Sequence, residues 1–237
     1  MRNELLLIIS VLIIYGTVVA AYRIFGKKGL YVMTALSTVL ANIEVLILID
    51  GFGMEQTLGN VMFASTYLIT DILSENEGKK SAANAVWLGV CSSVVMLIFT
   101  QYWRLYIPSQ SDWASQHINA IFSTTPRLLL ASLLGYIISQ RFDVWLYHYW
   151  WDLTSKKSGD KKRFLWLRNN GSTLISQFVN TVIFTLIAFA GWYDNKTLIS
   201  VMTSSYIIYI FTSILDTPAV YFSRMLKENN KIPTDDN

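Results

Sequence analysis

Long apolar runs separated by short polar segments make up most of the sequence. A helix needs about 20 mostly apolar residues to cross the hydrocarbon core of a bilayer, and seven runs approach that length. They cover residues 5–22, 30–49, 58–73, 83–102, 127–147, 172–192 and 198–222. The pattern predicts an all-α, polytopic membrane helix bundle with six or seven transmembrane helices.

Two of the seven runs have ambiguous features. The third is short and ends in the acidic residues Asp71, Glu75 and Glu77, so six spans is the alternative count. The first follows Arg2, as a signal peptide would, but its apolar run is longer than the roughly 7–15 residues usual there, so we expect a retained helix. We expect one transmembrane domain over residues 1–226 and a polar, disordered tail over residues 227–237.

Composition supports a membrane protein and excludes several kinds of site. Hydrophobic residues make up 53% of the chain, charged residues 15%, and the mean hydropathy is +0.38, whereas soluble domains usually carry about 25% charged residues. Cys91 is the single cysteine, which excludes an internal disulfide and cysteine-based zinc or iron–sulfur sites. His117 and His148 leave little for other metal chemistry, so no metal site is predicted.

Lysine and arginine are distributed unequally between alternate loops, and this bias predicts the orientation. With the N-terminus outside, the outside segments hold four basic residues: Arg2, Arg104, Arg127 and Lys196. The inside segments hold fourteen: Arg23, Lys27, Lys28, Lys79, Lys80, Lys156, Lys157, Lys161, Lys162, Arg163, Arg168, Arg224, Lys227 and Lys231. The bias favours seven spans and a cytoplasmic C-terminus, because six would place one terminus on the wrong side.

The basic stretch at residues 156–168 is expected to lie against anionic membrane lipid. No stacking aromatic residues are interleaved through its core, so no nucleic-acid partner is predicted.

Motifs for enzymatic chemistry are absent from the sequence. The segment Gly26-Lys27-Lys28-Gly29 lacks the spacing and the Lys-Ser/Thr ending of a phosphate-binding loop, and no HExxH, GxSxG or CxxC occurs. We therefore expect a protein that is not an enzyme, does not hydrolyse ATP by itself and needs no cofactor.

Polar side chains within the predicted spans are the candidates for function, because each one is costly in hydrocarbon. Thr173, Gln177 and Asn180 lie at i, i+4 and i+7 on one helical face, and Gln140 and Asp143 share a face at i, i+3. The predicted substrate-binding residues are Asn42, Glu44, Gln140, Asp143, Asn170, Thr173, Gln177, Asn180, Tyr209 and Asp216. The predicted gate or loop contacts are Asp71, Glu75, Arg127 and Arg168.

Carboxylates, amides and aromatic rings together suit a flat, polar solute. A carboxylate can accept two parallel N–H bonds from a guanidine-like edge, and an Asn or Gln amide can donate to a ring carbonyl. Stacking on an aromatic side chain contributes roughly 1–3 kcal/mol per base. These residue types predict a small-solute transporter for a nucleobase or a vitamin. For hydroxyls such as Ser172 and Ser204, hydrogen bonding between helices is the simpler explanation.

Short polar motifs, in order from about residue 35 to residue 222, resemble those of the queuosine precursor transporter family, also called the vitamin uptake transporter family. In the first half they are Ala41-Asn42-Ile43-Glu44, Leu58-Gly59-Asn60, Thr70-Asp71-Ile72-Leu73-Ser74-Glu75 and Gly78-Lys79-Lys80. In the second half they are Thr125-Pro126-Arg127, Ser139-Gln140 with Asp143, Leu165-Trp166-Leu167-Arg168-Asn169-Asn170 with Ser172-Thr173 and Ser176-Gln177, and Leu215-Asp216-Thr217-Pro218.

The resemblance implies import of a queuosine precursor across the inner (plasma) membrane. Such precursors are 7-deazaguanines, namely 7-cyano-7-deazaguanine, its 7-aminomethyl relative or queuine, and their guanine-like rings agree with the pocket chemistry above. Glu44 or Asp216 would then accept the ring N–H and the exocyclic amine. Asn42, Gln177 and Asn180 would serve the carbonyl edge.

Three positions depart from the family pattern. Many family members carry an acidic residue where Asn180 stands, a lysine where Tyr209 stands, and often a lysine near Ile47. Loss of an acid and a base together is what removal of one buried ion pair would produce, because a single remaining partner would be costly. The departure predicts a different precursor, such as a larger or uncharged one, or a different coupling.

Two other functions are compatible with the sequence. One is the substrate-binding subunit of an energy-coupling-factor vitamin importer, although the first two spans lack its Ala-x-x-x-Ala docking stripe. The other is an intramembrane enzyme, for which Asp71 and Glu75 at i, i+4 are the only paired acids. Proton symport and facilitated diffusion are equally compatible with the sequence, as are a compact monomer and a homodimer.

Overall fold

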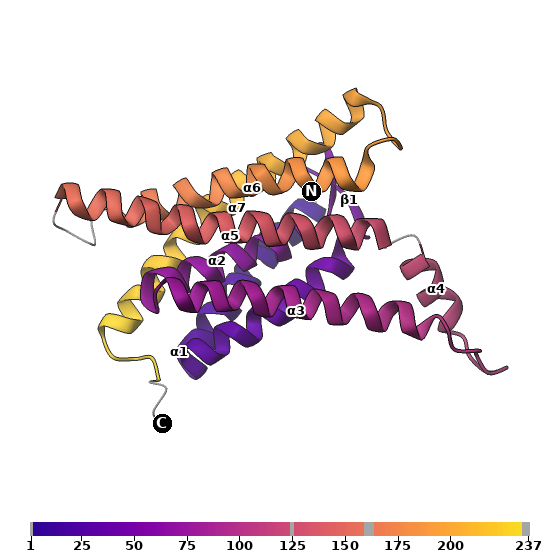
Figure 1. Ribbon diagram of the computed structural model, residues 1–237, viewed down its shortest axis with the longest axis horizontal. Coiled ribbons are helices and arrows are strands. Elements are labelled where there is room, and N and C mark those ends of the chain that lie inside the picture. The colour runs from indigo at the N-terminus through magenta and orange to yellow at the C-terminus, as the bar shows by residue number, and fades with distance from the viewer. Residues whose placement is uncertain (1, 124–125, 159–163, 234–237) are drawn as a thin grey trace.

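The computed structural model describes residues 2–123, 126–158 and 164–233 (Figure 1). Within these residues the chain forms seven helices and one two-stranded β-hairpin. The elements are α1 (Arg2–Glu44), β1 (Leu48–Gly51), β2 (Met54–Thr57), α2 (Gly59–Asn76), α3 (Lys79–Trp103), α4 (Ser115–Ser123), α5 (Pro126–Ser158), α6 (Leu165–Phe189) and α7 (Asn195–Glu228). The prediction of an all-α polytopic bundle is confirmed, with the short hairpin as its one addition among these residues.

α1 folds back on itself. Its 43 residues would extend about 65 Å as one straight helix. The Asn3 amide nevertheless donates a hydrogen bond to the Asp50 carbonyl at 2.7 Å, just beyond the far end of α1. The chain reverses at Gly26, whose φ of 59° and ψ of −146° suit glycine alone. The two arms of α1, residues 2–25 and 27–44, form the first and second predicted spans.

The seven predicted spans correspond in order to the two arms of α1 and to α2, α3, α5, α6 and α7. By length and composition, α1, α3, α6 and α7 can cross a membrane, and α5 qualifies together with α4. α2 is shorter and more polar because it lies inside the bundle, where 14 of its 18 residues are buried. It packs against α1, α3, α5 and α7.

The two chain termini lie at opposite ends of the bundle (Figure 1). At one end, which we call the hairpin end, Asn3 meets β1. At the other, which we call the Gly26 end, Tyr22 donates to Glu77 Oε1 at 2.7 Å and Lys227 pairs with the same oxygen at 2.5 Å. The chain therefore crosses the bundle an odd number of times, as the distribution of basic residues predicted.

Burial in this bundle is inverted relative to a soluble protein. Large apolar side chains face outward, for example Leu12, Ile98 and Phe211, which are 65%, 59% and 64% exposed. The buried face of α6 is polar at nine of its eleven positions. An apolar exterior suits lipid, and polar groups facing the interior of a bundle mark a solute or ion pathway.

The β-hairpin and α4 were not predicted. The apolar residues 46–49 continue the second predicted span in the sequence, but the helix ends at Glu44 and β1 pairs antiparallel with β2. The turn between the strands places Phe52 and Gly53 at positive φ, which matches the twist of a two-residue hairpin. α4 has only nine residues, too few to register as a span.

The ordered chain continues beyond the predicted boundary at residue 226. α7 ends at Glu228, and Ile232 packs against the hydrophobic core near the Gly26 turn. Residues 234–237 of the predicted tail, and residues 159–163 of the basic stretch, lie outside the described residues.

Candidate functional site

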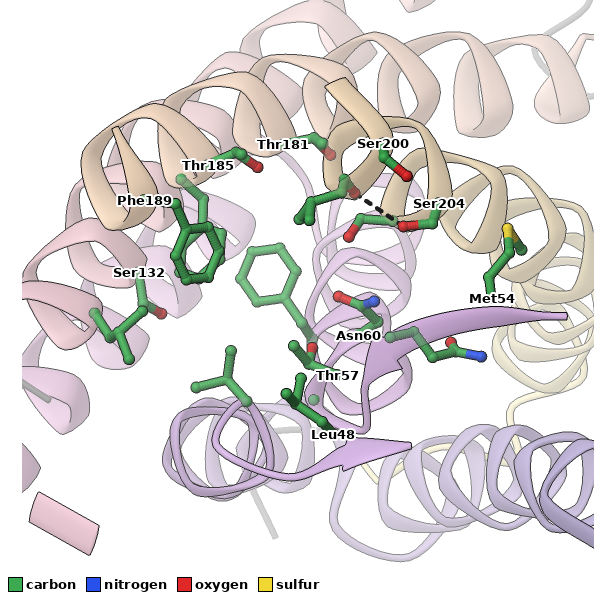
Figure 2. A pocket seen from close by; sticks show the side chains of 18 of the residues that line it. Leu48, Met54, Thr57, Asn60, Ser132, Thr181, Thr185, Phe189, Ser200 and Ser204 are labelled. Carbon is green, nitrogen blue, oxygen red and sulfur yellow. Dashed lines mark hydrogen bonds between the residues drawn. The ribbon is translucent and has the colours of Figure 1, made fainter. Parts of the chain in front are cut away.

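A cavity of about 1240 Å³ opens at the hairpin end of the bundle. The hairpin, α4 and the adjoining parts of α1, α2, α5, α6 and α7 line it. Figure 2 shows that Thr57, Asn60, Thr181, Thr185 and Ser204 surround this space together with apolar side chains. Among the described lining residues, Lys196 is the one that carries a charge. The cavity therefore suits a polar solute with little or no net charge.

The inner end of the cavity combines an aromatic ring with an unpaired amide. The Phe63 ring packs edge-on against Tyr67 and Tyr136, with centroids 5.6 and 6.1 Å apart, and at a tilt against Tyr209 at 6.1 Å. Tyr209 Oη donates to Asn60 Oδ1 at 3.1 Å. The other polar atom of this amide, the buried Asn60 Nδ2, has no hydrogen-bond acceptor. A buried donor without a partner is costly unless a ligand satisfies it.

A polar face of α6 leads from the cavity into the bundle. Asn180 lines the cavity, and Gln177 and Thr173 follow it, all three on the buried side of the helix, as their spacing predicted. The Gln177 Oε1 atom is buried without a hydrogen-bond donor. The Thr173 hydroxyl donates to Asp71 Oδ2 at 2.9 Å.

Three carboxyl groups, which we call the acidic cluster, lie deeper in the bundle: Asp71 of α2, Asp143 of α5 and Asp216 of α7. Each of these residues is at most 1% exposed, and the charge of Asp71 would interact with those of the other two. Asp216 accepts a hydrogen bond from Asn169 Nδ2 at 2.6 Å. Both oxygens of Asp143 and one of Asp71 have no hydrogen-bond partner. The hydroxyls of Ser172 and Ser176 on α6 face Asp143.

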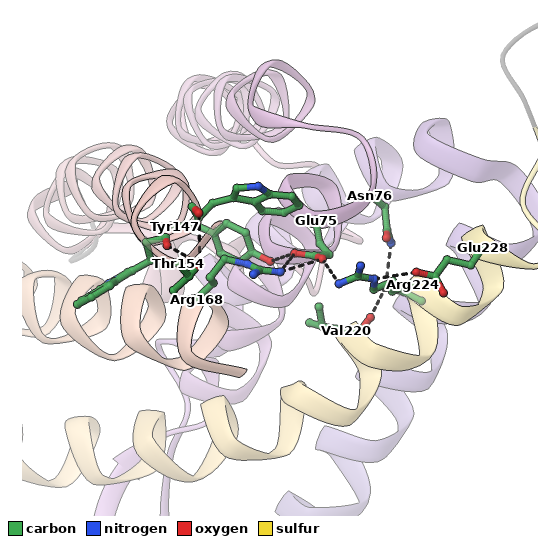
Figure 3. Close-up of polar contacts among 11 residues, drawn as sticks. Glu75, Asn76, Tyr147, Thr154, Arg168, Val220, Arg224 and Glu228 are labelled. Atoms are coloured by element: carbon green, nitrogen blue, oxygen red, sulfur yellow. Dashed lines mark hydrogen bonds and ion pairs between the residues drawn. The ribbon is translucent and has the colours of Figure 1, made fainter. Parts of the chain in front are cut away.

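The Gly26 end of the bundle is closed by ion pairs and hydrogen bonds around Glu75 (Figure 3). Glu75 accepts from Arg168 Nη2 at 2.9 Å, from Arg224 Nη1 at 2.6 Å and from Tyr147 Oη at 2.6 Å. The Arg168 guanidinium also lies 4.4 Å from the centre of the Trp151 ring. The Glu75 and Arg168 side chains are each 1% exposed. We call these residues the Glu75 network, which joins α2, α5, α6 and α7.

The predicted binding residues do not all lie on the cavity. Asn180 and Tyr209 line it. Those beside or within the acidic cluster are Asp143, Thr173, Gln177 and Asp216. Of the predicted gate residues, Glu75 and Arg168 meet in the Glu75 network, whereas Asp71 belongs to the acidic cluster.

Asn42 and Gln140 hold helices together. Asn42 donates to the Thr38 carbonyl and to Ser93 of α3 and accepts from Ser132 of α5. Gln140 donates to Thr66 and accepts from Thr70, both on α2. Both amides form hydrogen bonds between helices within the protein.

Three other predicted residues lie away from the cavity lining. Glu44 is the last residue of α1 and is only partly buried, so it is not at depth in the bundle. Asn170 bonds to the hydroxyls of Thr217 and Ser213 on α7. Arg127 donates to the Ile187 and Ala190 carbonyls at 2.7 and 2.6 Å and so caps the C-terminal end of α6.

Asn60 and Phe63 were not among the predicted site residues. On α2, Asn60, Phe63, Tyr67, Asp71 and Glu75 succeed one another at intervals of three or four residues and so share one face. This spacing could have joined Asn60 and Phe63 to the two predicted acids. Phe63 resembled an ordinary apolar residue, however, and its three aromatic partners come from other parts of the chain or the next turn.

The sequence is similar to those of known proteins over most of its length. Residues 57–223 match a family described as "Putative vitamin uptake transporter". The chain is 35% identical over 231 residues to a Bacillus subtilis (strain 168) protein named "Probable queuosine precursor transporter", covering 98% of this chain and 99% of that relative. No solved structure matches the chain.

These matches include the inner end of the cavity, the acidic cluster and most of the Glu75 network. Both names describe transporters and neither describes an energy-coupling-factor subunit, so that alternative is not favoured. Together with the apolar helices and the polar interior, they confirm the resemblance noted in the sequence. The chain belongs to the vitamin uptake transporter family and is a multi-pass membrane transporter.

Proposed function

We propose that this protein imports a 7-deazaguanine precursor of queuosine through the cavity at the hairpin end. The observation that carries the proposal is the inner end of the cavity, where the Phe63 ring and the unpaired Asn60 amide lie together. The volume of about 1240 Å³ gives room for a bicyclic base with its water. The name of the Bacillus subtilis relative supports the same class of substrate.

The contacts available at the inner end match a guanine-like ring. Phe63 would stack on the ring, a contact worth about 1–3 kcal/mol. Asn60 Nδ2 would donate to the ring carbonyl, and the Asn180 amide would pair with the polar edge of the ring. Asn60 thereby joins Asn180 in the carbonyl-edge role that the sequence suggested for Asn42, Gln177 and Asn180, whereas Glu44 and Asp216 do not line the cavity.

Within this class, the cavity favours an uncharged substrate. Its described lining holds no carboxylate to pair with the ammonium of the 7-aminomethyl compound or the amine of queuine. Moving an unpaired cation out of water is costly, so we expect 7-cyano-7-deazaguanine to bind best. Asn180 and Tyr209, which stand where the family pattern has an acid and a lysine, both line this cavity.

The hairpin end would face the outside and the Glu75 network the cytoplasm of the inner (plasma) membrane. This orientation places Arg23, Lys79 and Lys227, among other basic residues, on the cytoplasmic side. The structure would then be outward-open, with the cavity accessible and the cytoplasmic end closed. Alternating access also requires a second state, in which the hairpin end is closed and the cytoplasmic end is open.

Equilibrium binding to the purified protein tests this proposal. We expect saturable binding of 7-cyano-7-deazaguanine, binding of the 7-aminomethyl compound at least tenfold weaker, and none of adenine, which lacks the ring carbonyl. Equal affinity for adenine and 7-cyano-7-deazaguanine would contradict the proposed recognition. Absence of binding by every deazaguanine, with the protein shown to be folded, would contradict the substrate class.

A further inference from the structure

We propose that the acidic cluster formed by Asp71, Asp143 and Asp216 is a proton-binding site, and that its protons cross the membrane together with the substrate. This inference rests on the proposed function for the substrate, but the protonation of the cluster can be tested without any substrate.

The cluster has more hydrogen-bond acceptors than donors. Both oxygens of Asp143, one oxygen of Asp71, and the amide oxygens of Asn169 and Gln177 are buried without a donor. The Ser176 hydroxyl, which is fully buried and faces Asp143, can donate to one of these oxygens, which leaves the others without a donor. An ionised carboxylate only accepts hydrogen bonds, whereas a protonated one supplies an O–H donor. Bound protons would supply donors to the acceptors that the neighbouring hydroxyls and amides leave unpaired.

Among the described residues, no cation pairs with the cluster. None of the ion pairs between described residues includes Asp71, Asp143 or Asp216. A buried carboxylate without a cation partner takes up a proton rather than keep its charge. In addition, no three acidic, histidine or cysteine side chains of the described residues are placed to hold a metal ion. The three carboxyls also lie outside the cavity lining, and we assign the proton as the cation that they bind.

The groups that face the cluster from the neighbouring helices leave this conclusion unchanged. Tyr15 of α1 faces Asp71 and Asp216, Tyr67 of α2 faces Asp143, and Tyr147 of α5 faces Asp71; none of these phenols is a cation. Glu75, on the next turn of α2, adds a further negative charge beside Asp71. The two arginines of the Glu75 network, from α6 and α7, already bind Glu75.

The cluster lies between the cavity and the closed end of the bundle. On α2, Asp71 follows Asn60 by 11 residues, about 16 Å along the helix, and precedes Glu75 by a single turn. On α7, Asp216 lies between Tyr209 of the cavity and Arg224 of the network. Protons would therefore enter from the cavity side and leave when the Glu75 network opens. With an uncharged substrate, each proton would carry one positive charge inward.

Uptake into proteoliposomes tests the coupling. With radiolabelled 7-cyano-7-deazaguanine, an inside-alkaline gradient of one pH unit should raise accumulation up to about tenfold per coupled proton. An inside-negative potassium diffusion potential should raise it as well. In Asp143→Asn the ratio of uptake with the gradient to uptake without it should fall to about one. The control Asp112→Asn, in the exposed loop before α4, should keep the wild-type ratio.

Infrared spectroscopy of the purified protein tests the protonation directly. We expect a carbonyl band of protonated carboxyl groups at neutral pH, reduced in Asp143→Asn and in Asp216→Asn. Absence of this band would overturn the proton site, whatever the transport result. Exchange of substrate without any response to the gradients would overturn the coupling but keep the proposed function. A band without exchange of any deazaguanine would support the site and contradict the proposed function.

Discussion

Phe63 is the residue on which recognition of a flat ring depends most in this account. Its ring ends the cavity and is held in place by Tyr67, Tyr136 and Tyr209. We predict that Phe63→Ala weakens binding of 7-cyano-7-deazaguanine by about 1–3 kcal/mol, roughly 5- to 150-fold, because stacking is lost. Equilibrium binding to the purified variant measures the effect.

The matched control for this substitution is Phe99→Ala on α3, which removes an outward-facing ring that is 52% exposed. It should leave the affinity unchanged. Equal affinities of the Phe63 and Phe99 variants would show that the substrate does not stack at the inner end of the cavity.

Glu75 is the residue on which closure of the Gly26 end depends. We predict that Glu75→Gln lowers the free energy of unfolding by about 3–5 kcal/mol, because it removes the buried carboxylate that both Arg168 and Arg224 bind. Glu228→Gln is the matched control, since Glu228 pairs with Arg224 at the surface and is 45% exposed. The free energy of unfolding of the Glu228→Gln variant should fall by at most a few tenths of a kcal/mol. Thermal unfolding of the two variants in one detergent compares them, and similar losses would contradict the structural role of Glu75.

At the scale of elements, the reversal of α1 depends on Gly26. A Cβ at this position would lie 2.8 Å from the Pro233 carbonyl oxygen, and the positive φ is unfavourable for other residues. We predict that Gly26→Ala lowers stability by about 1–3 kcal/mol. Gly16→Ala, in the first arm of the same helix and with open space around it, should be neutral or stabilising by up to about 1 kcal/mol. If unfolding measurements rank the two variants the other way, α1 does not reverse at Gly26.

The start of α7 offers a test of a charge outside the membrane. Asp194 caps this helix, and hydrogen bonds from the Thr197 hydroxyl and backbone N–H hold the pKa of Asp194 below its ordinary value of 3.8. The ionised Asp194 carboxylate therefore stabilises the fold fully above pH 3.8. This stabilisation is lost as the pH falls through the lowered pKa of Asp194.

We predict that Asp194→Asn, which keeps the cap but removes the charge, is less stable than wild type at neutral pH. The difference should disappear in acid, below both pKa values. Thermal unfolding across a pH series measures it, and a difference that persists unchanged in acid would refute the electrostatic contribution of the cap.

Most elements could be predicted from the sequence because lipid selects long apolar runs, and all seven predicted spans correspond to helical segments. The β-hairpin could not, because residues 46–49 are as apolar as the span that precedes them. In the sequence, the reversal at Gly26 corresponds only to a polar gap between the first two apolar runs. α4 is too short to show against the loops around it.

At the scale of the whole molecule, three layers follow one another from the hairpin end to the Gly26 end. The nearly uncharged cavity comes first, then the buried acidic cluster, then the closed Glu75 network. α2 contributes to each layer from one face, which explains why a helix with such a polar face is buried inside the bundle. Transport in this account requires the first layer to close as the third opens.

Part of the geometry of the candidate site could be predicted from the sequence. Helical spacing was sufficient to place Thr173, Gln177 and Asn180 on one buried face, because those residues share a helix. Spacing could not show that Asn42 is satisfied by Ser93 and Ser132, since these partners come from other helices. Depth along a span was equally hard to judge, which is why Glu44 seemed to lie inside the bundle.

Rescue of queuosine in tRNA tests the central claim most directly. The gene is expressed in cells that neither synthesise queuosine nor import its precursors, and each deazaguanine is supplied separately. We predict rescue by 7-cyano-7-deazaguanine at concentrations at least tenfold lower than those needed of the 7-aminomethyl compound. Failure of every deazaguanine to restore queuosine, with the protein present in the membrane, would contradict the claim that this chain imports a queuosine precursor.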